Sequence, residues 1–307
     1  MMTHRPGGWT TRRPYLIWAY DYDVAAGGGK MLHRLCHELR AAGEDAYVVS
    51  ATPEIWTASP ERGSVSGLEL ATNPEWDTPV FEGELDGMWT AVYPEIVPGN
   101  PWGAPQVARW VLNLPGRLGG DRSYAPDELV FAYHERFYPG VPLLCLPWFD
   151  PIYVDRGEPR EGAVCYIGKS NGGPLPEPAP PITLAMRRDP QKLAAVLNRA
   201  ERMYSFDEES GMIYIARLCG CPVTLVRGDG LEELPSDTTA FHAAHRLRMV
   251  EFREQLGRFI EITQGSRATT QGRKFTRPTP RGLPSGSAYS ERHQGSSYGY
   301  ERPLSPP

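Results

Sequence analysis

The stretch that decides the fold is residues 15–49, YLIWAYDYDVAAGGGKMLHRLCHELRAAGEDAYVV. It begins with a short apolar run rich in β-forming side chains, and a polar turn and a glycine-rich loop, Gly27-Gly-Gly-Lys30, follow. Apolar residues then recur every three or four positions up to Gly43, which predicts an amphipathic helix. Ala46 to Val49 predicts the next strand. This order of strand, loop, helix and strand predicts a right-handed β-α-β unit in a parallel sheet.

Strands and helices alternate along the rest of the chain in two series, separated by a polar stretch at 155–162. In the first series we expect strands at 89–97, 129–133 and 141–146 and a helix at 104–114. In the second we expect strands at 163–167, 182–186, 203–206 and 222–226, and helices at 190–200, 210–218 and 240–262. Two such series predict an α/β fold with two Rossmann-like lobes. The predicted divisions are a flexible N-terminus at 1–14, lobes at 15–154 and 155–262, and a tail at 263–307.

The composition indicates a folded chain. Of its 307 residues 40% are hydrophobic, which excludes global disorder although 32 are Gly and 31 are Pro. No apolar run reaches the roughly 18 residues of a membrane span, and the N-terminus carries no apolar signal segment, so we expect a cytoplasmic protein. The five cysteines are scattered without C-x-x-C spacing, which favours neither disulfides nor a zinc site.

The C-terminal segment differs in charge from the rest. From Gln264 to Pro307 there are seven cations and two anions, a net charge of +5. Since the whole chain has a net charge of −5, residues 1–263 carry −10. The segment also holds six Pro, six Gly and seven Ser, which predicts disorder. Its cations and the side chains of Tyr289, Tyr298 and Tyr300 suit salt-dependent binding of nucleic acid, and a solvated linker is the simpler alternative.

The glycine loop is the first candidate site. Gly28 and Gly29 would let backbone N–H groups approach a phosphate or an acceptor at a helix N-terminus. The loop is not a Walker A motif, because Val24 stands at its first Gly position and Met31 at its Ser/Thr position. Nor is it the dinucleotide fingerprint, since Leu32 replaces the third Gly. A structural loop without a ligand is the alternative.

Two patterns that could indicate a metal are weak. Asp21-Tyr-Asp23 spells D-x-D, which can hold a divalent cation, but the tripeptide is common by chance and follows the first strand directly. His33 and His37 have the i, i+4 spacing of a ligand pair without an acidic third ligand nearby, which favours histidines that are exposed or line a cleft. We therefore expect no metal site.

Two polar residues directly follow predicted strands of the first series. Glu95 and His134 stand where the carboxyl ends of parallel strands present side chains to ligands, so both are candidates for the acceptor side of a site. Plain surface residues are the alternative.

The most informative stretch is residues 204–223, YSFDEESGMIYIARLCGCPV. It resembles the C-terminal lobe signature of GT-B glycosyltransferases, in which an acidic residue opens a loop, a Glu lies on the following helix, and Gly-x-Pro-Val enters the next strand. Alignment on Gly220 to Val223 puts Asp207 at the first acidic position and Ile215 at the second. The ribose contact of that second Glu would then pass to Glu208 or Glu209. Acids that cap a helix N-terminus are the alternative.

Other segments carry the same resemblance. Residues 28–39 look like the first Gly-loop helix of such enzymes, and 92–101 with 109–116 are similar to bacterial or phage polysaccharide-type members. Tyr166-Ile-Gly-Lys169 opens the second lobe where these enzymes place a basic residue on the diphosphate. Residues 170–181 depart from the family, because they are too short and too rich in Gly and Pro for the helix usually found there.

The resemblance implies a glycosyltransferase, cytoplasmic and metal-independent, that moves a sugar from a nucleotide-sugar to a hydroxyl acceptor on a glycan, protein or modified nucleobase with retention of anomeric configuration. No cofactor is implied besides the nucleotide-sugar co-substrate. The implied donor-binding residues are Gly28, Gly29, Lys169, Arg187, Ser205, Glu208, Glu209 and Ser210. The implied catalytic residues are Asp207, Glu95 and His134. A catalytically degenerate GT-B module that binds a glycan or a protein is the alternative.

Overall fold

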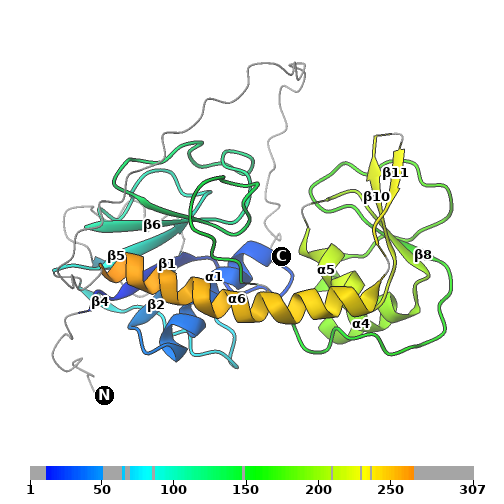
Figure 1. Ribbon diagram of the computed structural model, residues 1–307, viewed down its shortest axis with the longest axis horizontal. Coiled ribbons are helices and arrows are strands. Elements are labelled where there is room, and N and C mark those ends of the chain that lie inside the picture. The colour runs from blue at the N-terminus through cyan, green and yellow to red at the C-terminus, as the bar shows by residue number, and fades with distance from the viewer. Residues whose placement is uncertain are drawn as a thin grey trace, which may run out of the picture. The chain divides into compact units, whose positions relative to one another are not determined.

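The protein has an α/β fold with a parallel five-strand sheet and a second, mixed sheet (Figure 1). The computed structural model describes residues 12–50, 64–65, 70–84, 87–146, 149–208, 210–228, 230–235 and 237–265. The first sheet has the strand order β2-β1-β5-β6-β7. Its strands are β1 (Tyr15–Ala19), β2 (Ala46–Ser50), β5 (Thr90–Pro94), β6 (Gln106–Val111) and β7 (Leu129–Ala132). Helix α1 (Gly27–Ala41) joins β1 to β2, which confirms the predicted β-α-β unit.

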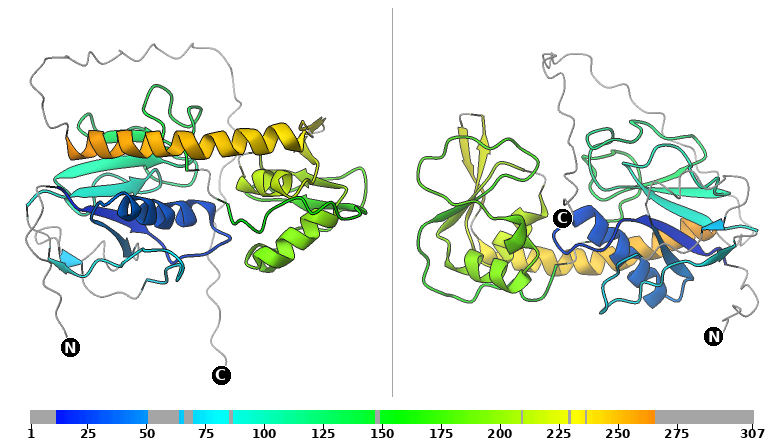
Figure 2. Two further views of the ribbon diagram at one scale, coloured as in Figure 1. Left: turned by 60° about the horizontal axis from the view of Figure 1, so that its bottom comes forward. Right: turned by 180° about the vertical axis from the view of Figure 1, so that it is seen from behind.

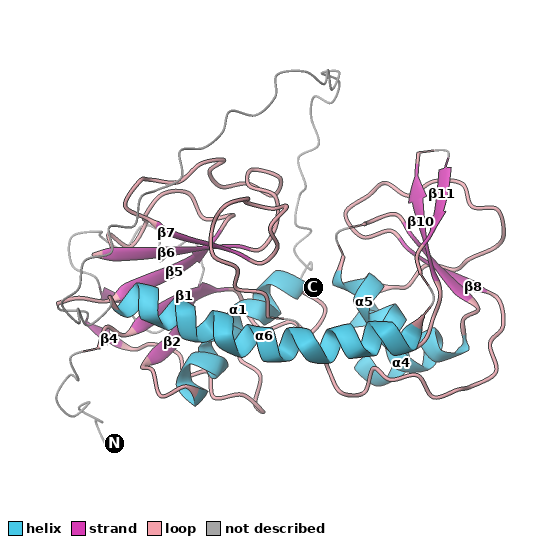
Figure 3. Ribbon diagram, viewed as in Figure 1, coloured by secondary structure: helices cyan, strands magenta, loops and turns pink. Residues whose placement is uncertain are grey.

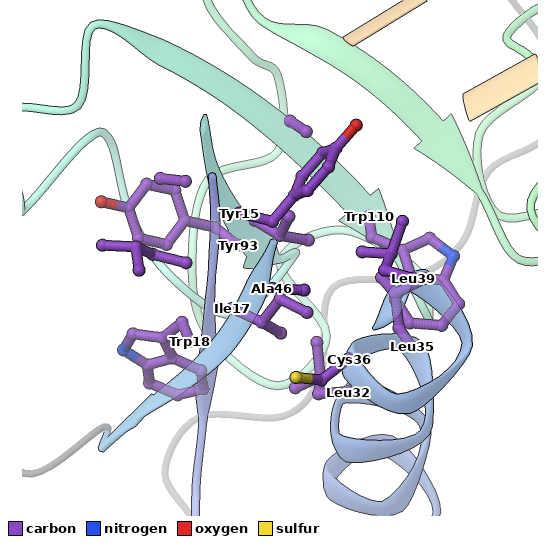
Figure 4. Close-up of a cluster of buried hydrophobic side chains, with 14 of the residues drawn as sticks. Tyr15, Ile17, Trp18, Leu32, Leu35, Cys36, Leu39, Ala46, Tyr93 and Trp110 are labelled. Carbon is purple, nitrogen blue, oxygen red and sulfur yellow. The ribbon is translucent and has the colours of Figure 1, made fainter. Parts of the chain in front are cut away.

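Both faces of the central strands are buried, so successive side chains of β1 enter two different layers. Figure 4 shows α1 directing Leu32, Leu35 and Leu39 toward the face of the sheet that carries Ile17. Trp18 lies on the opposite face, on the same side as Tyr93 of β5. The first core therefore extends through the sheet rather than along one side of it.

Within the described part of the chain, no helix covers that opposite face between β5 and β7. Figure 3 shows that residues 95–105 and 112–128, which connect β5 to β6 and β6 to β7, are loops. The predicted helix at 104–114 is therefore wrong, because this segment contains the strand β6. A strand buried on both faces reads as a nearly continuous apolar run, and in this run Ala104, Val107, Ala108 and Val111 also fit helical spacing.

The second sheet has the order β11-β10-β9-β8, in which β8, β9 and β10 are parallel and β11 is antiparallel. Its strands are β8 (Ala163–Tyr166), β9 (Arg202–Ser205), β10 (Val223–Arg227) and β11 (Gly230–Glu233). Helices α4 (Pro190–Arg199) and α5 (Gly211–Leu218) pack their buried side chains into its core. Sequence analysis located the three parallel strands and missed β11, whose residues are all exposed.

Two further expectations need correction. The predicted strand at 182–186 is instead a short helix, α3 (Leu184–Arg187), which begins because the Thr183 side chain accepts a hydrogen bond from the Met186 N–H. The expected strand at 141–146 is reduced to a single parallel bridge between Leu143 and Ala132. A small antiparallel pair, β3 (Ser64–Val65) and β4 (Gly83–Glu84), completes the strands of the described residues.

Helix α6 (Thr238–Gln264) contributes to both cores, running from beside α5 to the first sheet in the views of Figure 1 and Figure 2. Phe241 belongs to the core of the second sheet, whereas Phe252 and Phe259 belong to the core of the first. The Phe259 ring lies 4.7 Å from the Phe131 ring and 5.8 Å from the Tyr15 ring, measured between centroids. The predicted helix at 240–262 is thus confirmed, and it forms a covalent link between the two sheets.

The helix end is fixed by polar contacts as well. The Tyr15 hydroxyl lies 2.6 Å from the Thr263 hydroxyl, and the Gln264 side chain donates to the Arg13 carbonyl at 3.0 Å. Arg12 pairs with the buried Glu44. The described end of the expected N-terminal segment is therefore tied to the first sheet.

The expected basic tail lies outside the described residues from 266 onward, so its predicted disorder and nucleic-acid binding stay predictions. No helix within the described ranges is both long and apolar enough to cross a membrane.

We expect Phe259→Ala to lower the free energy of unfolding by about 3–5 kcal/mol, because it opens a cavity between α6 and the first sheet. Leu247→Ala on the same helix is the control, and since Leu247 is 57% exposed it should change stability by less than about 0.5 kcal/mol. Urea unfolding measures both. Equal losses would mean that α6 is not anchored through Phe259.

Candidate functional site

The candidate site is built on the carboxyl ends of the parallel strands in the two sheets, where ligands of α/β proteins bind. In the first sheet the chain leaves β1 for β2 on one side and returns to β5 on the other, so the strand order reverses between β1 and β5. The residues that follow these two strands are the turn at 20–26, the glycine loop that begins α1, and Glu95. The reversal of strand order thus brings the glycine loop and Glu95, both predicted site residues, to the same point of the sheet.

Glu95 is the buried carboxyl group of this edge. It is 3% exposed, and its carboxylate accepts a hydrogen bond from the Leu112 N–H at 2.9 Å, just beyond the end of β6. Burial raises the pKa of Glu95, while the Leu112 N–H and the Lys169 ammonium act in the opposite direction. A carboxyl group with a raised pKa is better matched to accepting a proton near neutral pH.

The glycine loop lies next to the same strand end. Gly28 is exposed in the first turn of α1, and a Cβ built on it would be 3.9 Å from the Leu112 side chain. Gly29, the next residue, is half-buried. The backbone of this turn therefore lies close to the strand end that binds Glu95.

Asp207 and Lys169 occupy the carboxyl edge of the second sheet. Asp207 follows β9, is 4% exposed, and accepts a hydrogen bond from the Lys169 N–H at 3.2 Å. Gly168 has φ +62°, and a Cβ there would be 2.5 Å from the Asp207 Cβ and 2.8 Å from the Tyr166 ring. Only glycine can therefore bring the loop after β8 this close to the Asp207 carboxylate.

Four other predicted residues surround Asp207 in sequence. The buried Ser205 hydroxyl donates to the Asp207 carbonyl at 3.0 Å, which shapes the turn after β9. Ser210 is the N-cap of α5, where its hydroxyl accepts from the Met212 N–H. Glu208 is half exposed and forms an ion pair with Arg227 at 2.9 Å. Glu209 lies outside the described residues.

Electrostatic contacts connect the two edges through Lys169. Partial burial lowers the pKa of Lys169, and Arg117 acts in the same direction. Asp207 and Glu95 oppose that shift, so the ammonium group interacts with both carboxylates. The structure thus joins Lys169 to Asp207 by a hydrogen bond, and the charge of Glu95 also acts on the Lys169 ammonium.

Two arginines of the second sheet's region contact the turn after β1. Arg187 donates to the Ala25 carbonyl at 3.4 Å, and its guanidinium lies 5.8 Å from the centroid of the Tyr166 ring. Arg188 binds the Asp23 carboxylate at 2.7 and 3.1 Å, and this hydrogen bond lowers the pKa of Asp23. Asp23 of the D-x-D pattern therefore has a cationic side chain as its partner.

His134 lies apart from this group. It is exposed after β7, and its ring accepts a hydrogen bond from the Arg136 N–H at 3.2 Å. No group of three or more His, Cys, Asp or Glu side chains in the described residues is placed to hold a metal ion.

Sequence analysis gave no role to Lys30, which directly follows the three glycines. Its side chain is 6% exposed, and its ammonium lies 5.9 Å from the centroid of the Phe149 ring. Burial lowers the pKa of Lys30 to about 8, against the opposing effect of Asp150. Its place in the first turn of a helix after a glycine loop was a signal that could have identified it.

Ile215, which the sequence resemblance aligns with the second Glu of GT-B glycosyltransferases, is a core residue. It is 8% exposed and packs in the cluster formed by α4, α5 and the second sheet. A carboxylate at this position would be buried among apolar side chains.

Comparison with protein-family models, curated proteins and solved structures finds no match to this chain.

Gly168→Ala should destabilise the protein by about 2 kcal/mol more than Gly172→Ala. Both residues have positive φ, so both alanines carry a backbone cost of roughly 1–2 kcal/mol. Only at Gly168 does the new Cβ overlap Asp207, since at Gly172 the nearest atom is 3.7 Å away. Denaturant unfolding of the two variants measures the difference, and equal losses would show that the contact between Gly168 and Asp207 is loose.

His33 should make stability pH-dependent. It is fully buried in α1, and its Nε2 lies 2.7 Å from the Tyr20 carbonyl and so carries the proton. Its Nδ1 has no hydrogen-bond partner among the residues that the structure describes. Burial lowers the pKa of folded His33, so the stability it confers is present above the unfolded pKa near 6.5 and falls as pH decreases below it. The loss between pH 7.5 and 5.5 should reach up to about 1.4 kcal/mol.

Urea unfolding of the wild type and of His33→Gln at both pH values isolates this effect. The variant should lose less stability on acidification than the wild type. The reduction should exceed that in His134→Gln, an exposed position whose pKa is also lowered by partial burial. An unchanged pH dependence in His33→Gln would contradict the assignment.

Proposed function

We propose that the chain is a glycosyltransferase that moves a sugar from a nucleotide-sugar donor to a hydroxyl acceptor, and that its two sheets are the Rossmann-like lobes of a GT-B fold. The observation that carries the proposal is that Glu95 and Asp207 are buried carboxyl groups at the carboxyl edges of two different sheets, with the Lys169 N–H bound to Asp207. Each lobe would then contribute one acidic group to the site, and Lys169 would bind the diphosphate of the donor.

The donor would bind on the second sheet. Lys169 and Arg187 would offset the charge of the diphosphate, and the first amides of α5 would add the favourable end of the helix dipole. Asp207, held in place by the Lys169 N–H, would contact the sugar. Glu208 would contact the ribose, since Ile215 is in the core.

Transfer would form a bond between the acceptor oxygen and the anomeric carbon and break the bond from that carbon to the diphosphate oxygen. The hydroxyl proton would pass to the Glu95 carboxylate, whose burial raises its pKa, and the nucleoside diphosphate would leave with the bonding electrons. The resemblance to GT-B enzymes implies retention, so the acceptor oxygen would attack the face of the sugar from which the diphosphate leaves. The anomeric proton coupling of the product measures this outcome.

Binding of the donor is tested by isothermal titration with UDP, GDP and dTDP. One of the three should bind to the wild type, and Lys169→Ala should weaken that binding about tenfold or more through loss of the diphosphate contact. Glu161→Gln, at an exposed carboxylate, should leave the affinity unchanged. Absence of binding of all three at millimolar concentration would contradict the donor site.

Chemistry is tested by a hydrolysis screen over nucleotide-sugars, because hydrolysis needs no known acceptor. With the donor that is hydrolysed, Glu95→Gln should lower kcat about a hundredfold or more while the affinity for the nucleotide is kept. Equal turnover by Glu95→Gln and the wild type would remove Glu95 from the mechanism.

Two observations favour a second candidate, a GT-B module that binds a glycan or a protein without catalysis. Ile215 occupies the position of the family's ribose-binding Glu, and no helix follows β8 before Pro181, which bridges back to Cys165. Nucleotide or glycan binding without donor hydrolysis would support this candidate over the enzyme.

A further inference from the structure

A full positive charge lies inside the first sheet. Arg109, in the middle of β6, is completely buried. A buried cation is tolerated only when its donors are matched by acceptors, because removing it from water costs several kcal/mol. The position of those acceptors therefore shows what the arginine holds.

Most of these acceptors lie in the turn after β5. The guanidinium donates to the carbonyl oxygens of Pro94 at 3.3 Å, Val97 at 2.6 Å and Gly99 at 2.7 Å. Its Nε pairs with the Glu128 carboxylate at 2.8 Å. The three carbonyls belong to residues on both sides of Glu95, so the arginine binds the backbone that carries this carboxyl group.

Two aromatic rings lie close to the same guanidinium. The centroid of the Tyr93 ring lies 5.3 Å from its central carbon, and that of the Tyr124 ring lies 5.0 Å away. A planar group with five donors can satisfy three carbonyls and a carboxylate while it stacks on rings, whereas an ammonium has three donors and no plane. The site is therefore specific for arginine.

The other side of the turn is equally constrained. Leu112, three residues beyond Arg109, donates its N–H to the Glu95 carboxylate. Gly120 has φ +75°, and a Cβ built there would overlap the Glu95 carbonyl and lie 2.8 Å from the carbonyl carbon of Ile96. Glu95 is thus fixed at its backbone by Arg109 and Gly120 and at its carboxylate by the end of β6.

We infer that Arg109 is a positioning residue, whose guanidinium holds the turn after β5 so that the Glu95 carboxylate stays buried against the Leu112 N–H. As a statement about catalysis this rests on the proposed function, in which Glu95 accepts the proton. As a statement about the Glu95 carboxyl group it can be measured without any substrate.

The test is the titration midpoint of Glu95, followed by carbon-13 NMR of the side-chain carboxyl groups in the full chain, with Glu95→Gln assigning the signal. Arg109→Lys keeps the positive charge and removes the planar guanidinium with its five donors. The loosened turn should admit water, so the midpoint should fall toward its ordinary value. In the hydrolysis assay kcat should fall at least tenfold while KM for the donor changes less than twofold.

Glu128→Gln is the control for a merely structural role. It removes the ion pair, which should lower stability, but leaves the three carbonyl contacts, so the Glu95 midpoint should not move. If Arg109→Lys does not fold, Gly120→Ala decides, because it displaces the Glu95 carbonyl from the other side and should also lower the midpoint. An unchanged midpoint in the variants that fold would overturn the inference.

Failure of the proposed function is distinguishable from failure of this inference. A lowered midpoint in Arg109→Lys, in a protein that neither binds nor hydrolyses any nucleotide-sugar, would leave the positioning role in place and remove the transferase. Loss of activity in Arg109→Lys with an unchanged Glu95 midpoint would leave the transferase in place and remove the positioning role.

Discussion

The rest of the structure depends on the burial of α6 in two separate cores. Its first half packs Phe241 with α5, and its second half packs Phe252 and Phe259 on the first sheet. Because one continuous helix must satisfy both cores at once, the sheet that carries Asp207 is bound to the sheet that carries Glu95 by hydrophobic burial. Contacts across the two, such as that of Arg188 with Asp23, then need little energy of their own.

The side of the first sheet without helices explains why a charge is buried there. The connections after β5 and β6 are loops, and a loop against a sheet leaves backbone carbonyls that need donors. Arg109 supplies several donors from one residue of the sheet itself, and Glu128 balances its charge. These hydrogen bonds hold the loops at the carboxyl edge in place without helices. A buried carboxyl group such as Glu95 requires such fixed surroundings, because its hydrogen-bond partners must stay in position.

The sequence predicted what depends on local pattern. The unit from β1 to β2, the helices α4, α5 and α6, and the parallel strands of the second sheet follow from periodicity and from Gly and Pro at their ends. The strand β6 was taken for a helix because burial on both faces removes the alternation that marks a strand, and Arg109 was overlooked with it. Lys169 and Glu95 are 74 positions apart, so their interaction depends on tertiary packing that no local pattern contains.

The departure at Ile215 is explained by the same packing. On α5 this position faces the core, and a Glu there would need a polar or charged partner that the surrounding cluster of apolar side chains does not offer. Glu208, by contrast, is half exposed and paired with an arginine that is itself more than half exposed, and such surface pairs contribute about 0–1 kcal/mol. Under the proposed function, ribose hydroxyls would displace that arginine at little cost, and the nucleotide contact would come from the loop before α5 rather than from the helix.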